Sequence, residues 1–353
     1  MADLRDFTQQ LQSKLDLSEE SCLAAAESLT LPEVPADDKK AFLMALHDKG
    51  ETVDEVTAFA KLFRQLASDP QLSDIAPRAI DIVGTGGSGS KGFNISSVTA
   101  IVVAAAGEKV LKHGNRAITS QSGSADFLTQ LGIRMDTDPS QLRAAIEELN
   151  FCFFFAPAFH PAFKEIMPVR MQLAKEGKRT IFNILGPLIN PAKPLYQLLG
   201  VFSSDWVQPL ADSLHQLGLL RGLAVSCQLP NGGFMDEITT AGVNHIAGFG
   251  GFAEIKTQWK ASDLQMPPAN PNELKGGTAE ENVAMLREII EGKGPGGLVD
   301  SLLLNAAAAF LILDRVEDMR EGCALAKEIL LGGAVREWLL RAEAFYKATS
   351  PEG

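Results

Sequence analysis

The sequence predicts an α/β protein with two parts, a small N-terminal helical domain and a larger α/β domain. Up to about residue 72, apolar residues recur at helical spacing, with breaks at Pro32, Pro35 and Gly50 and no convincing strand. From Ile80 onward, short apolar runs that favour strands alternate with helical patterns. Such alternation favours a parallel or mixed sheet covered by helices.

The segment SDPQLSDIAPRA, at 68–79, is the expected linker, because Pro70 and Pro77 interrupt regular structure. The domains are therefore expected at residues 1–75 and 76–353. Strands are expected at 80–83, 109–112, 133–135, 151–155, 195–202 and 222–227, with a hairpin from Gly233 to Ile255, and helices at 96–106, 123–131, 139–149, 207–218, 280–291, 298–313 and from Val316 to the C-terminus.

Composition narrows the class of protein. With 353 residues, 46% of them hydrophobic and 22% charged, the chain can bury a sizeable core. A net charge of −12 argues against a protein that clamps nucleic acid over its whole surface. No apolar run reaches the roughly 18 residues of a membrane span, and the N-terminus lacks a basic segment followed by an apolar one. We expect a cytoplasmic protein with reduced, mostly buried thiols, because its cysteines have neither paired nor metal-ligand spacing: Cys22, Cys152, Cys227 and Cys323.

The first chemical signal is a glycine loop between the strand expected at 80–83 and the helix expected at 96–106. It contains Gly84, Gly86, Gly87, Gly89 and Gly92. Glycines leave backbone N–H groups uncovered, and a helix N-terminus follows, so the loop is a candidate site for a phosphate or pyrophosphate.

Three interpretations of this loop compete. Residues 84–89 satisfy the dinucleotide pattern G-x-G-x-x-G. A dinucleotide site also needs an acid at the end of the second strand to bind the ribose, but Glu108 precedes that strand and no acid ends it. The Walker pattern of nucleoside triphosphate sites requires Gly before its Lys and Ser or Thr after it. It fails here, because Ser90 precedes Lys91 and Gly92 follows it. A glycine-rich turn that binds nothing is the structural alternative, and five glycines in nine positions make it less favoured.

A second polar segment follows the next strand. Lys112, His113, Asn115 and Arg116 are followed by several hydroxyl side chains between Thr119 and Ser124. At the carboxyl edge of an α/β sheet these groups would lie beside the glycine loop, where ligands bind. Cations, an imidazole, amides and hydroxyls gathered there suit a polyanion. Each residue taken singly is as well explained as a solvated loop residue or a buried histidine.

Between about residues 41 and 310, a series of motifs closely resembles the anthranilate phosphoribosyltransferases, which belong to the nucleoside phosphorylase/phosphoribosyltransferase-like glycosyltransferases. The motifs occur in this order: AFLMALHDKGETVDEV, DIVGTGGSG, FNIS, KHGNR, SGSAD, APAFHPAFK, PVR, RTIFNILGPLINPA and GGTAEEN.

The resemblance implies a helical domain completed by helices near 171–195, an α/β domain with a mainly parallel sheet, and a homodimer formed through the helical part. It implies transfer of phosphoribosyl from phosphoribosyl pyrophosphate to the amino group of anthranilate, with release of pyrophosphate and use of Mg²⁺, as a step of tryptophan biosynthesis. Neither nucleic acid nor membrane is an expected partner.

The resemblance also implies roles for individual residues. Lys112 is the expected electrostatic catalytic group, since the substrate supplies the nucleophilic nitrogen. The residues on phosphoribosyl pyrophosphate positions are Gly84, Thr85, Gly86, Gly87, Ser88, Asn94, Ser96, Lys112 and Ser124. The anthranilate positions are Gly84, His113, Asn115 and Arg170, and the metal positions are Ser96, Asp236 and Glu237.

The required chemistry agrees with these residue types. Breaking the C1–O bond places negative charge on pyrophosphate, which loop amides, Lys112 and a hard cation held by carboxylates stabilise. The planar fork of Arg170 matches the two oxygens of a carboxylate.

The chain departs from the family pattern in three places. Ser88 replaces a usual Asp, Gln121 a frequent Lys, and Ser226-Cys227-Gln228 a strand end that is usually His-Gly. These departures leave two alternatives open: a same-fold phosphoribosyltransferase or nucleoside phosphorylase with another acceptor, and a non-catalytic paralogue that binds nucleic acid.

Overall fold

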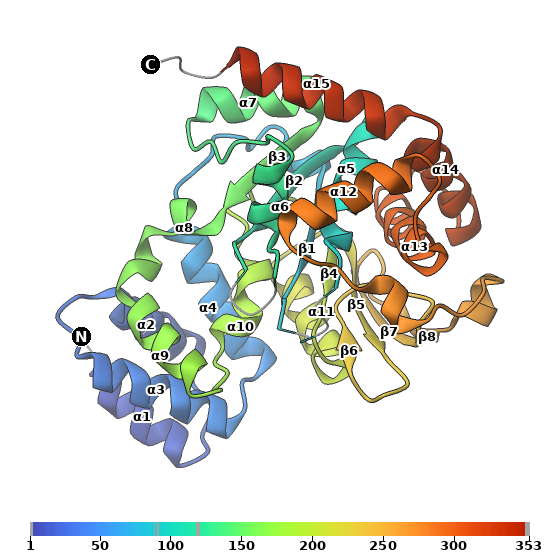
Figure 1. Cartoon of the computed structure of the whole chain (residues 1–353). Helices are drawn as coiled ribbons and strands as arrows, with labels where there is room; N and C mark the ends of the chain where they lie inside the picture. The colour runs from blue at the N-terminus through green and yellow to red at the C-terminus, as the bar shows by residue number, and fades with distance from the viewer. Residues whose placement is uncertain (1–2, 88, 90–91, 118–120, 350–353) are drawn as a thin grey trace.

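The computed structural model describes residues 3–87, 89, 92–117 and 121–349. It has a lobe of N-terminal helices beside a larger lobe built on one sheet, as Figure 1 shows. The strands are β1 (Ala79–Gly84), β2 (Lys109–Gly114), β3 (Phe151–Phe155), β4 (Tyr196–Gly200), β5 (Arg221–Gln228), β6 (Phe234–Met235), β7 (Val243–Gly250) and β8 (Lys256–Trp259).

The sheet is mainly parallel, as the sequence predicts. Its strand order is β3-β2-β1-β4-β5-β7-β8, with β6 paired to β5. The strands from β3 to β5 in this order run parallel, whereas β6, β7 and β8 are antiparallel to their neighbours. Strands β2 and β3 lie on one side of β1, and the strands from β4 onward lie on its other side. The chain therefore reverses its direction of travel across the sheet beside β1, and ligands bind at such a switch point in α/β sheets.

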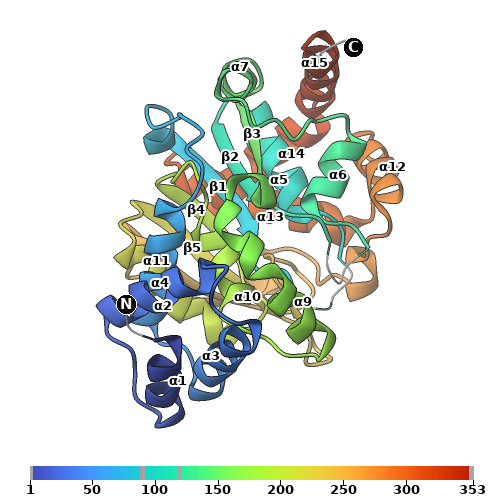
Figure 2. The same cartoon turned by 90° about the vertical axis from the view of Figure 1, so that its left-hand side faces the viewer.

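Helices cover both faces of the sheet (Figures 1 and 2). Alternate residues of β1 divide between the two cores: Ile80 and Ile82 belong to one, Val83 to the other. The first core contains residues of α5 (Ile95–Ala105), α6 (Ser124–Gln130), α12 (Ala279–Ile290), α13 (Gly296–Ile312), α14 (Met319–Leu331) and α15 (Ala334–Ala348).

The opposite face carries the helical lobe. Its core joins residues of α1 (Leu4–Gln12), α2 (Glu19–Thr30), α3 (Ala36–Lys49), α4 (Val53–Gln65), α9 (Met167–Lys175), α10 (Phe182–Leu185) and α11 (Val207–Gln216). In Figure 2, α9 and α10 lie beside the N-terminal helices, and Lys39 on α3 donates a hydrogen bond to the carbonyl of Glu165 just before α9 (3.3 Å). A smaller core under α7 (Pro139–Leu149) and α8 (Ala156–Phe159) packs against β3.

Several sequence predictions need correction. Residues 133–135 form no strand: they follow α6 without joining a ladder, although Ile133 is buried. The buried side chain of Ile133 explains the strand-like sequence pattern, but no neighbouring strand pairs with these residues. The C-terminal helical segment is two helices, because Gly333 adopts a φ of 106° between α14 and α15. The expected hairpin extends to Trp259, since β7 pairs with both β5 and β8.

All four cysteines are free thiols, as expected, and three of them are buried. In the described part of the chain, none of the helices combines the length and the apolar character that crossing a membrane requires.

Candidate active site

The candidate site lies at the ends of β1 and β2, beyond the residues that their ladder pairs. Their ladder pairs Ala79 with Lys109 and Ile80 with Val110, and beyond that point side chains bridge the two strands. The ammonium of Lys112 donates a hydrogen bond to the carbonyl of Ile82, and the N–H of His113 donates to the carboxylate of Asp81 (3.2 Å). Lys112 lies in β2, within the strand expected at 109–112. The strand continues through His113 and Gly114, which were expected to follow it.

The two charged side chains that link β1 and β2, Lys112 and Asp81, are both buried. Lys112 is 1% exposed and Asp81 is 0% exposed. Burial lowers the pKa of Lys112 to about 8, although Asp81 and Glu237 act in the opposite direction. Burial likewise raises the pKa of Asp81 to about 6, against the effects of the Asn190 amide and of Lys112. A buried cation directed at the carboxyl end of the sheet can stabilise an anion with little screening by water.

The glycine loop has the backbone that its composition predicts. Gly86, Gly87 and Gly89 adopt φ values of 64°, 76° and 72°, in the left-handed region that favours glycine. The Thr85 hydroxyl accepts from the N–H of Phe202 (3.0 Å), which ties the loop to the end of β4. Ser88, an expected ligand of phosphoribosyl pyrophosphate, lies outside the described residues.

The two acids of the expected metal site lie directly against this loop. Asp236 accepts a hydrogen bond from the N–H of Gly86 at its Oδ2 (3.1 Å). Gly84 and Gly200 make the approach possible: a Cβ at Gly84 would lie 2.5 Å from Asp236 Oδ2, and one at Gly200 would lie 1.6 Å from the Asp236 carbonyl oxygen. Burial and then the neighbouring Asp236 raise the pKa of Glu237 well above its ordinary value.

This donor set fits a hard cation. Carboxylates from Asp236 and Glu237 and the hydroxyl of Ser96 are oxygen ligands, and Ser96 lies 3.4 Å from the Lys112 ammonium. Burial raises the pKa of Glu237 most, repulsion from Asp236 adds to it, and a bound cation would offset both effects. Within the described residues, no cluster of three or more His, Cys, Asp or Glu side chains could hold a metal ion alone. The pair therefore suits Mg²⁺ that takes its remaining ligands from water and substrate phosphates.

Asn94 and Ser124 occupy the ends of neighbouring loops. Asn94 precedes α5, and its Oδ1 accepts hydrogen bonds from the Ser122 hydroxyl (3.0 Å) and from Asn282 (2.7 Å). Ser124 begins α6 and donates its hydroxyl to the carbonyl of Asn115 (3.3 Å). The structure thereby draws the glycine loop, the segment after β2 and the start of α12 together.

The expected acceptor residues are only partly brought together. His113 is buried, and its Nδ1 lies 3.1 Å from the Gly186 carbonyl. A row of ring contacts leads from it through His160 (centroids 5.2 Å apart) and Phe163 (5.3 Å) to the Arg170 guanidinium, 5.8 Å from the Phe163 ring. The side chain of Asn115 is exposed and accepts from the N–H of Arg116 in its own loop (2.8 Å).

Arg170 and the two histidines leave polar capacity unused. Arg170 Nη2 donates to the Phe182 carbonyl at 3.4 Å, and burial lowers its pKa to about 10. Within the described residues, its guanidinium has no carboxylate within 4.0 Å. The Nε2 atoms of His113 and His160 are buried without a hydrogen-bond partner in the same part of the chain. Burial lowers the pKa of His113 to about 3 and that of His160 to about 4, so both rings are neutral at pH 7.

Three site neighbours were missed from sequence. Asp81 and Asn282 are fully buried within the family motifs. A polar residue in an apolar run was the available signal for Asp81, but Asn282 ends the polar motif GGTAEEN and carries no such signal. Arg179 donates to the Gly87 carbonyl (3.1 Å) and stacks on Phe202 at 4.1 Å. No sequence signal points to this contact, because the two segments are 92 residues apart.

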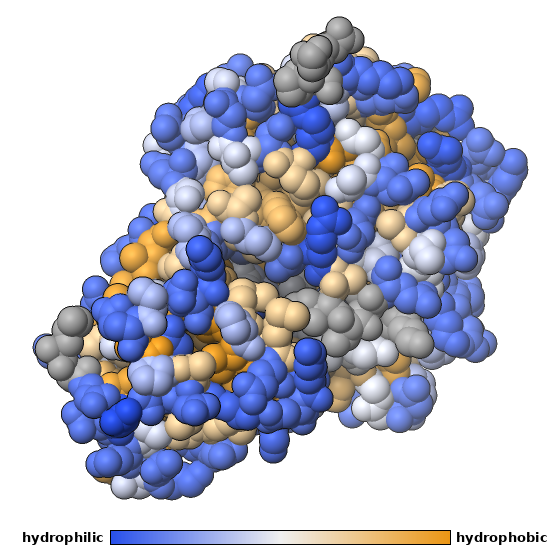
Figure 3. All heavy atoms as spheres, turned by 60° about the vertical axis from the view of Figure 1, so that its left-hand side comes forward, coloured by the Kyte–Doolittle hydropathy of each residue, from blue (hydrophilic) through white to orange (hydrophobic). Residues whose placement is uncertain are grey.

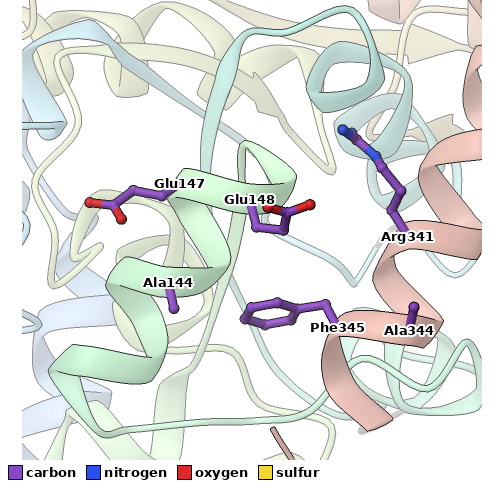
Figure 4. A pocket seen from close by; sticks show the side chains of 6 residues that line it. All are labelled: Ala144, Glu147, Glu148, Arg341, Ala344 and Phe345. Atoms are coloured by element: carbon purple, nitrogen blue, oxygen red, sulfur yellow. The ribbon is translucent and has the colours of Figure 1, made fainter. Parts of the chain in front are cut away.

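A separate hollow lies far from this constellation. Figure 4 shows it between α7 and α15, with a volume of about 480 Å³ and lining residues Ala144, Glu147, Glu148, Arg341, Ala344 and Phe345. Glu147 and Glu148 precede the start of β3 and so lie at the amino edge of the sheet. In Figure 3, apolar residues gather between the two lobes, whereas the outer surface of each lobe is mostly hydrophilic.

Comparisons with known proteins agree with the fold and with the motifs. The helical bundle domain of a glycosyl transferase family matches residues 5–67, and the α/β domain of that family matches residues 76–336. The anthranilate phosphoribosyltransferase of Parvibaculum lavamentivorans is 41% identical over 345 residues, covering 98% of each chain. The enzyme of that name from Bradyrhizobium diazoefficiens is 39% identical and covers 95% of this chain and 96% of its own.

Solved structures show the same likeness. The crystal structure of anthranilate phosphoribosyltransferase from Thermus thermophilus has a TM-score of 0.85 and 37% identity, covering 97% of this chain and 99% of its own. The Saccharomyces cerevisiae enzyme in complex with phosphoribosyl pyrophosphate and Mg has a TM-score of 0.84 and covers 98% of each chain, and its 24% identity makes this a likeness of fold.

Fold, loop and family models define a glycosyl transferase in which a helical bundle joins an α/β domain. With 41% identity to a relative over 98% of its length, the chain belongs to the anthranilate phosphoribosyltransferase family.

The first prediction concerns Gly200. In Gly200→Ala the new Cβ would overlap the Asp236 carbonyl, so we expect a loss of about 3 kcal/mol or more in unfolding free energy, or displacement of Asp236. Urea unfolding measures the loss. Gly296→Ala, at the start of α13 with only a side-chain oxygen at 4.0 Å, is the control. Equal stability of both variants would contradict the packing argument.

The second prediction concerns pH. The unfolded chain protonates His160 near pH 6.5, whereas the folded chain does so only near pH 4. This contribution to stability is complete above pH 6.5 and is lost as pH falls toward 4. On going from pH 7 to pH 5, the unfolding free energy of the wild type should fall by on the order of 2 kcal/mol more than that of His160→Gln. Urea unfolding at both pH values tests this, and identical losses would refute it.

Proposed function

We propose that the protein transfers phosphoribosyl from phosphoribosyl pyrophosphate to the amino nitrogen of anthranilate and releases pyrophosphate, a reaction of tryptophan biosynthesis. The observation that carries this proposal is the meeting of a buried cation, Lys112, with a glycine loop and the Asp236–Glu237 pair at the switch point of the sheet. Identity of 41% to a named anthranilate phosphoribosyltransferase supports the choice of substrates.

In this mechanism the chain supplies charge and placement, and no side chain attacks the sugar. The phosphate groups are placed against the glycine loop from Gly84 to Gly87, the amide of Asn94 and the hydroxyls of Ser96 and Ser124. Without substrate, the Thr85 N–H donates to the Gly200 carbonyl (2.9 Å) and the Gly86 N–H to Asp236 Oδ2 (3.1 Å). As the C1–O bond breaks, Lys112 stabilises the negative charge that develops on pyrophosphate, and its low exposure strengthens this effect. Anthranilate held near C1 supplies its nitrogen at high effective concentration.

Mg²⁺ fits the site as a partner of the substrate. Ser96, Asp236 and Glu237 would hold it, and when bound it neutralises charge on the pyrophosphate oxygens. The yeast relative, solved in complex with phosphoribosyl pyrophosphate and Mg, supports this choice of ion.

The acceptor is expected at the row from His113 to Arg170. The Arg170 guanidinium, which keeps unused donors beside Phe182, offers two parallel hydrogen bonds to the carboxylate of anthranilate. The aromatic rings that surround Arg170 offer stacking area for the acceptor ring. The neutral His113 and the amide of Asn115 complete the proposed acceptor set.

The test follows the fluorescence of anthranilate when the protein, phosphoribosyl pyrophosphate and Mg²⁺ are mixed, with each component omitted in turn. Loss of signal that requires every component supports the proposal. Loss of phosphoribosyl pyrophosphate with other aromatic acids only would identify a different acceptor, and the absence of binding of either substrate would overturn the catalytic assignment.

The third prediction concerns Arg170. We expect Arg170→Ala to weaken anthranilate binding by about 10- to 100-fold, the value of a charge-assisted bidentate contact, and to leave phosphoribosyl pyrophosphate binding nearly unchanged. Calorimetric titration of each substrate measures this. Arg221→Ala is a matched control, because Arg221 also stacks on an aromatic ring, Phe252 at 5.1 Å, but begins β5 at the opposite edge. Equal weakening for both substrates would remove Arg170 from the acceptor site.

The fourth prediction concerns the acid pair. Asp236→Asn combined with Glu237→Gln removes both carboxylates, so turnover that depends on Mg²⁺ should fall by at least about 100-fold. Mg²⁺ titrations of the initial rate measure the loss. The control replaces the adjacent pair Glu147 and Glu148 by glutamine in the distant hollow. Unchanged Mg²⁺ dependence in the site variant would exclude the pair as metal ligands.

The domain organisation and assembly are part of the proposal. We divide the chain at residues 75 and 76 and assign the helices near 171–195 to the helical unit, because α9 and α10 share its apolar core. A homodimer through this unit is supported by exposed apolar side chains on it, among them Leu15, Met167 and Met171. Light scattering that gives the mass of one chain would overturn the dimer.

A further inference from the structure

A segment distant in sequence supports the exit of the glycine loop. We call residues 274–282, which include the first turn of α12, the brace. The N–H of Phe93 donates to the carbonyl of Leu274 (3.0 Å), and Gly92 forms an isolated antiparallel bridge with Lys275. Gly276 packs so closely here that a Cβ would lie 2.7 Å from the Phe93 Cα. The backbone that precedes α5 is therefore paired with the brace.

One side chain extends this support from backbone to a site residue. Asn282 is 0% exposed. Its Oδ1 accepts from the N–H of Gly277 (2.8 Å), and its Nδ2 donates to Oδ1 of Asn94 (2.7 Å). A buried amide carries a large desolvation cost unless its groups are paired, so these contacts fix its orientation.

The contacts also fix the orientation of Asn94. Its Oδ1 accepts from Asn282 and from the Ser122 hydroxyl (3.0 Å), while its Nδ2 donates to the Ser122 carbonyl (3.3 Å). Both lone pairs of the oxygen and one hydrogen of the NH₂ group are thus engaged. Among the described residues, the second N–H of the half-buried Asn94 has no acceptor, so it is available to a phosphate or hydroxyl oxygen. Without the donor from Asn282, the Asn94 amide could rotate and present its oxygen instead.

We propose that Asn282 is a positioning residue for phosphoribosyl pyrophosphate, acting through the amide of Asn94. It touches no substrate, since its side chain is fully buried. The inference rests on the proposed function, in which Asn94 contacts that substrate. It assigns a role in binding to Asn282, the last residue of the motif GGTAEEN, which lies 188 residues from Asn94.

A double-mutant cycle tests the proposal. In Asn282→Ala we expect the Kd and KM for phosphoribosyl pyrophosphate to rise about tenfold, the value of one to two hydrogen bonds, with kcat changed less than threefold and anthranilate binding unchanged. Because Asn282 acts through Asn94, the double variant with Asn94→Ala should be within about twofold of Asn94→Ala alone. Effects that multiply in the double variant would overturn the proposal.

Two further variants separate positioning from general stability. Asn282→Asp keeps an acceptor for the Gly277 N–H but cannot donate to Asn94 Oδ1 when ionised, so its Kd should also rise at least tenfold. If Asn282→Ala does not fold, the cycle is run with Asn282→Asp. Thr278→Ala removes the side-chain cap of α12 (Thr278 Oγ1 to the Glu281 N–H, 3.2 Å) but keeps the Asn282 amide. Its Kd should match that of the wild type.

Direct titration with phosphoribosyl pyrophosphate distinguishes failure of the proposed function from failure of the positioning role of Asn282. A wild type that binds no phosphoribosyl pyrophosphate would overturn the proposed function and, with it, this role of Asn282. A wild type that binds and turns over substrate, beside Asn282 variants with unchanged Kd, would overturn the positioning role alone. A Kd raised equally in Thr278→Ala and Asn282→Ala would likewise overturn it, because loss of helix stability would then explain both.

Discussion

The constraint on which the site depends is the set of buried hydrogen bonds that links β1 to β2 beyond the last paired residues of their ladder. Once the ladder stops, the two strands are linked by Lys112 to the Ile82 carbonyl and by the His113 N–H to Asp81. Asn190 completes the frame by donating to both Asp81 (2.9 Å) and the Leu111 carbonyl (2.8 Å). Charges in an apolar interior are costly unless they are paired and hydrogen-bonded, so every partner here restricts where the Lys112 ammonium can lie.

Around this frame, glycines determine how closely the other segments approach. Gly84 and Gly200 admit the Asp236 backbone and carboxylate to the ends of β1 and β4, and Gly276 admits the brace to Phe93. The result is an arrangement with an acid pair, a buried cation and a glycine loop at one edge of the sheet. Such an arrangement is suited to a substrate whose charge is redistributed during reaction, because groups of both signs are already fixed in place.

Much of this could be predicted from sequence, and the limits have physical causes. The alternation of strands and helices and the glycine loop carry local signals, and Lys112 lies in the motif KHGNR. The acid pair lies outside the quoted motifs, and two adjacent acids carry only a weak signal of their own. The prediction of a strand at 133–135 was wrong because Ile133 is buried, as a strand residue would be, but these residues pair with no strand. Contacts such as Arg179 with Gly87 and Asn282 with Asn94 join segments far apart in the chain, so no local pattern encodes them.

The brace also has a consequence for the order in which the protein is made. Strands β1 to β5, the glycine loop and Lys112 are complete by residue 228, but Asp236, Glu237 and Asn282 have still to be synthesised at that point. Domains generally fold as units during synthesis, and contacts of long sequence separation form late. A nascent chain of this length lacks the acids, the brace and the helices α12 to α15 that cover one face of the sheet. Competence for the whole reaction therefore emerges only near the end of translation, when α12 packs against α6.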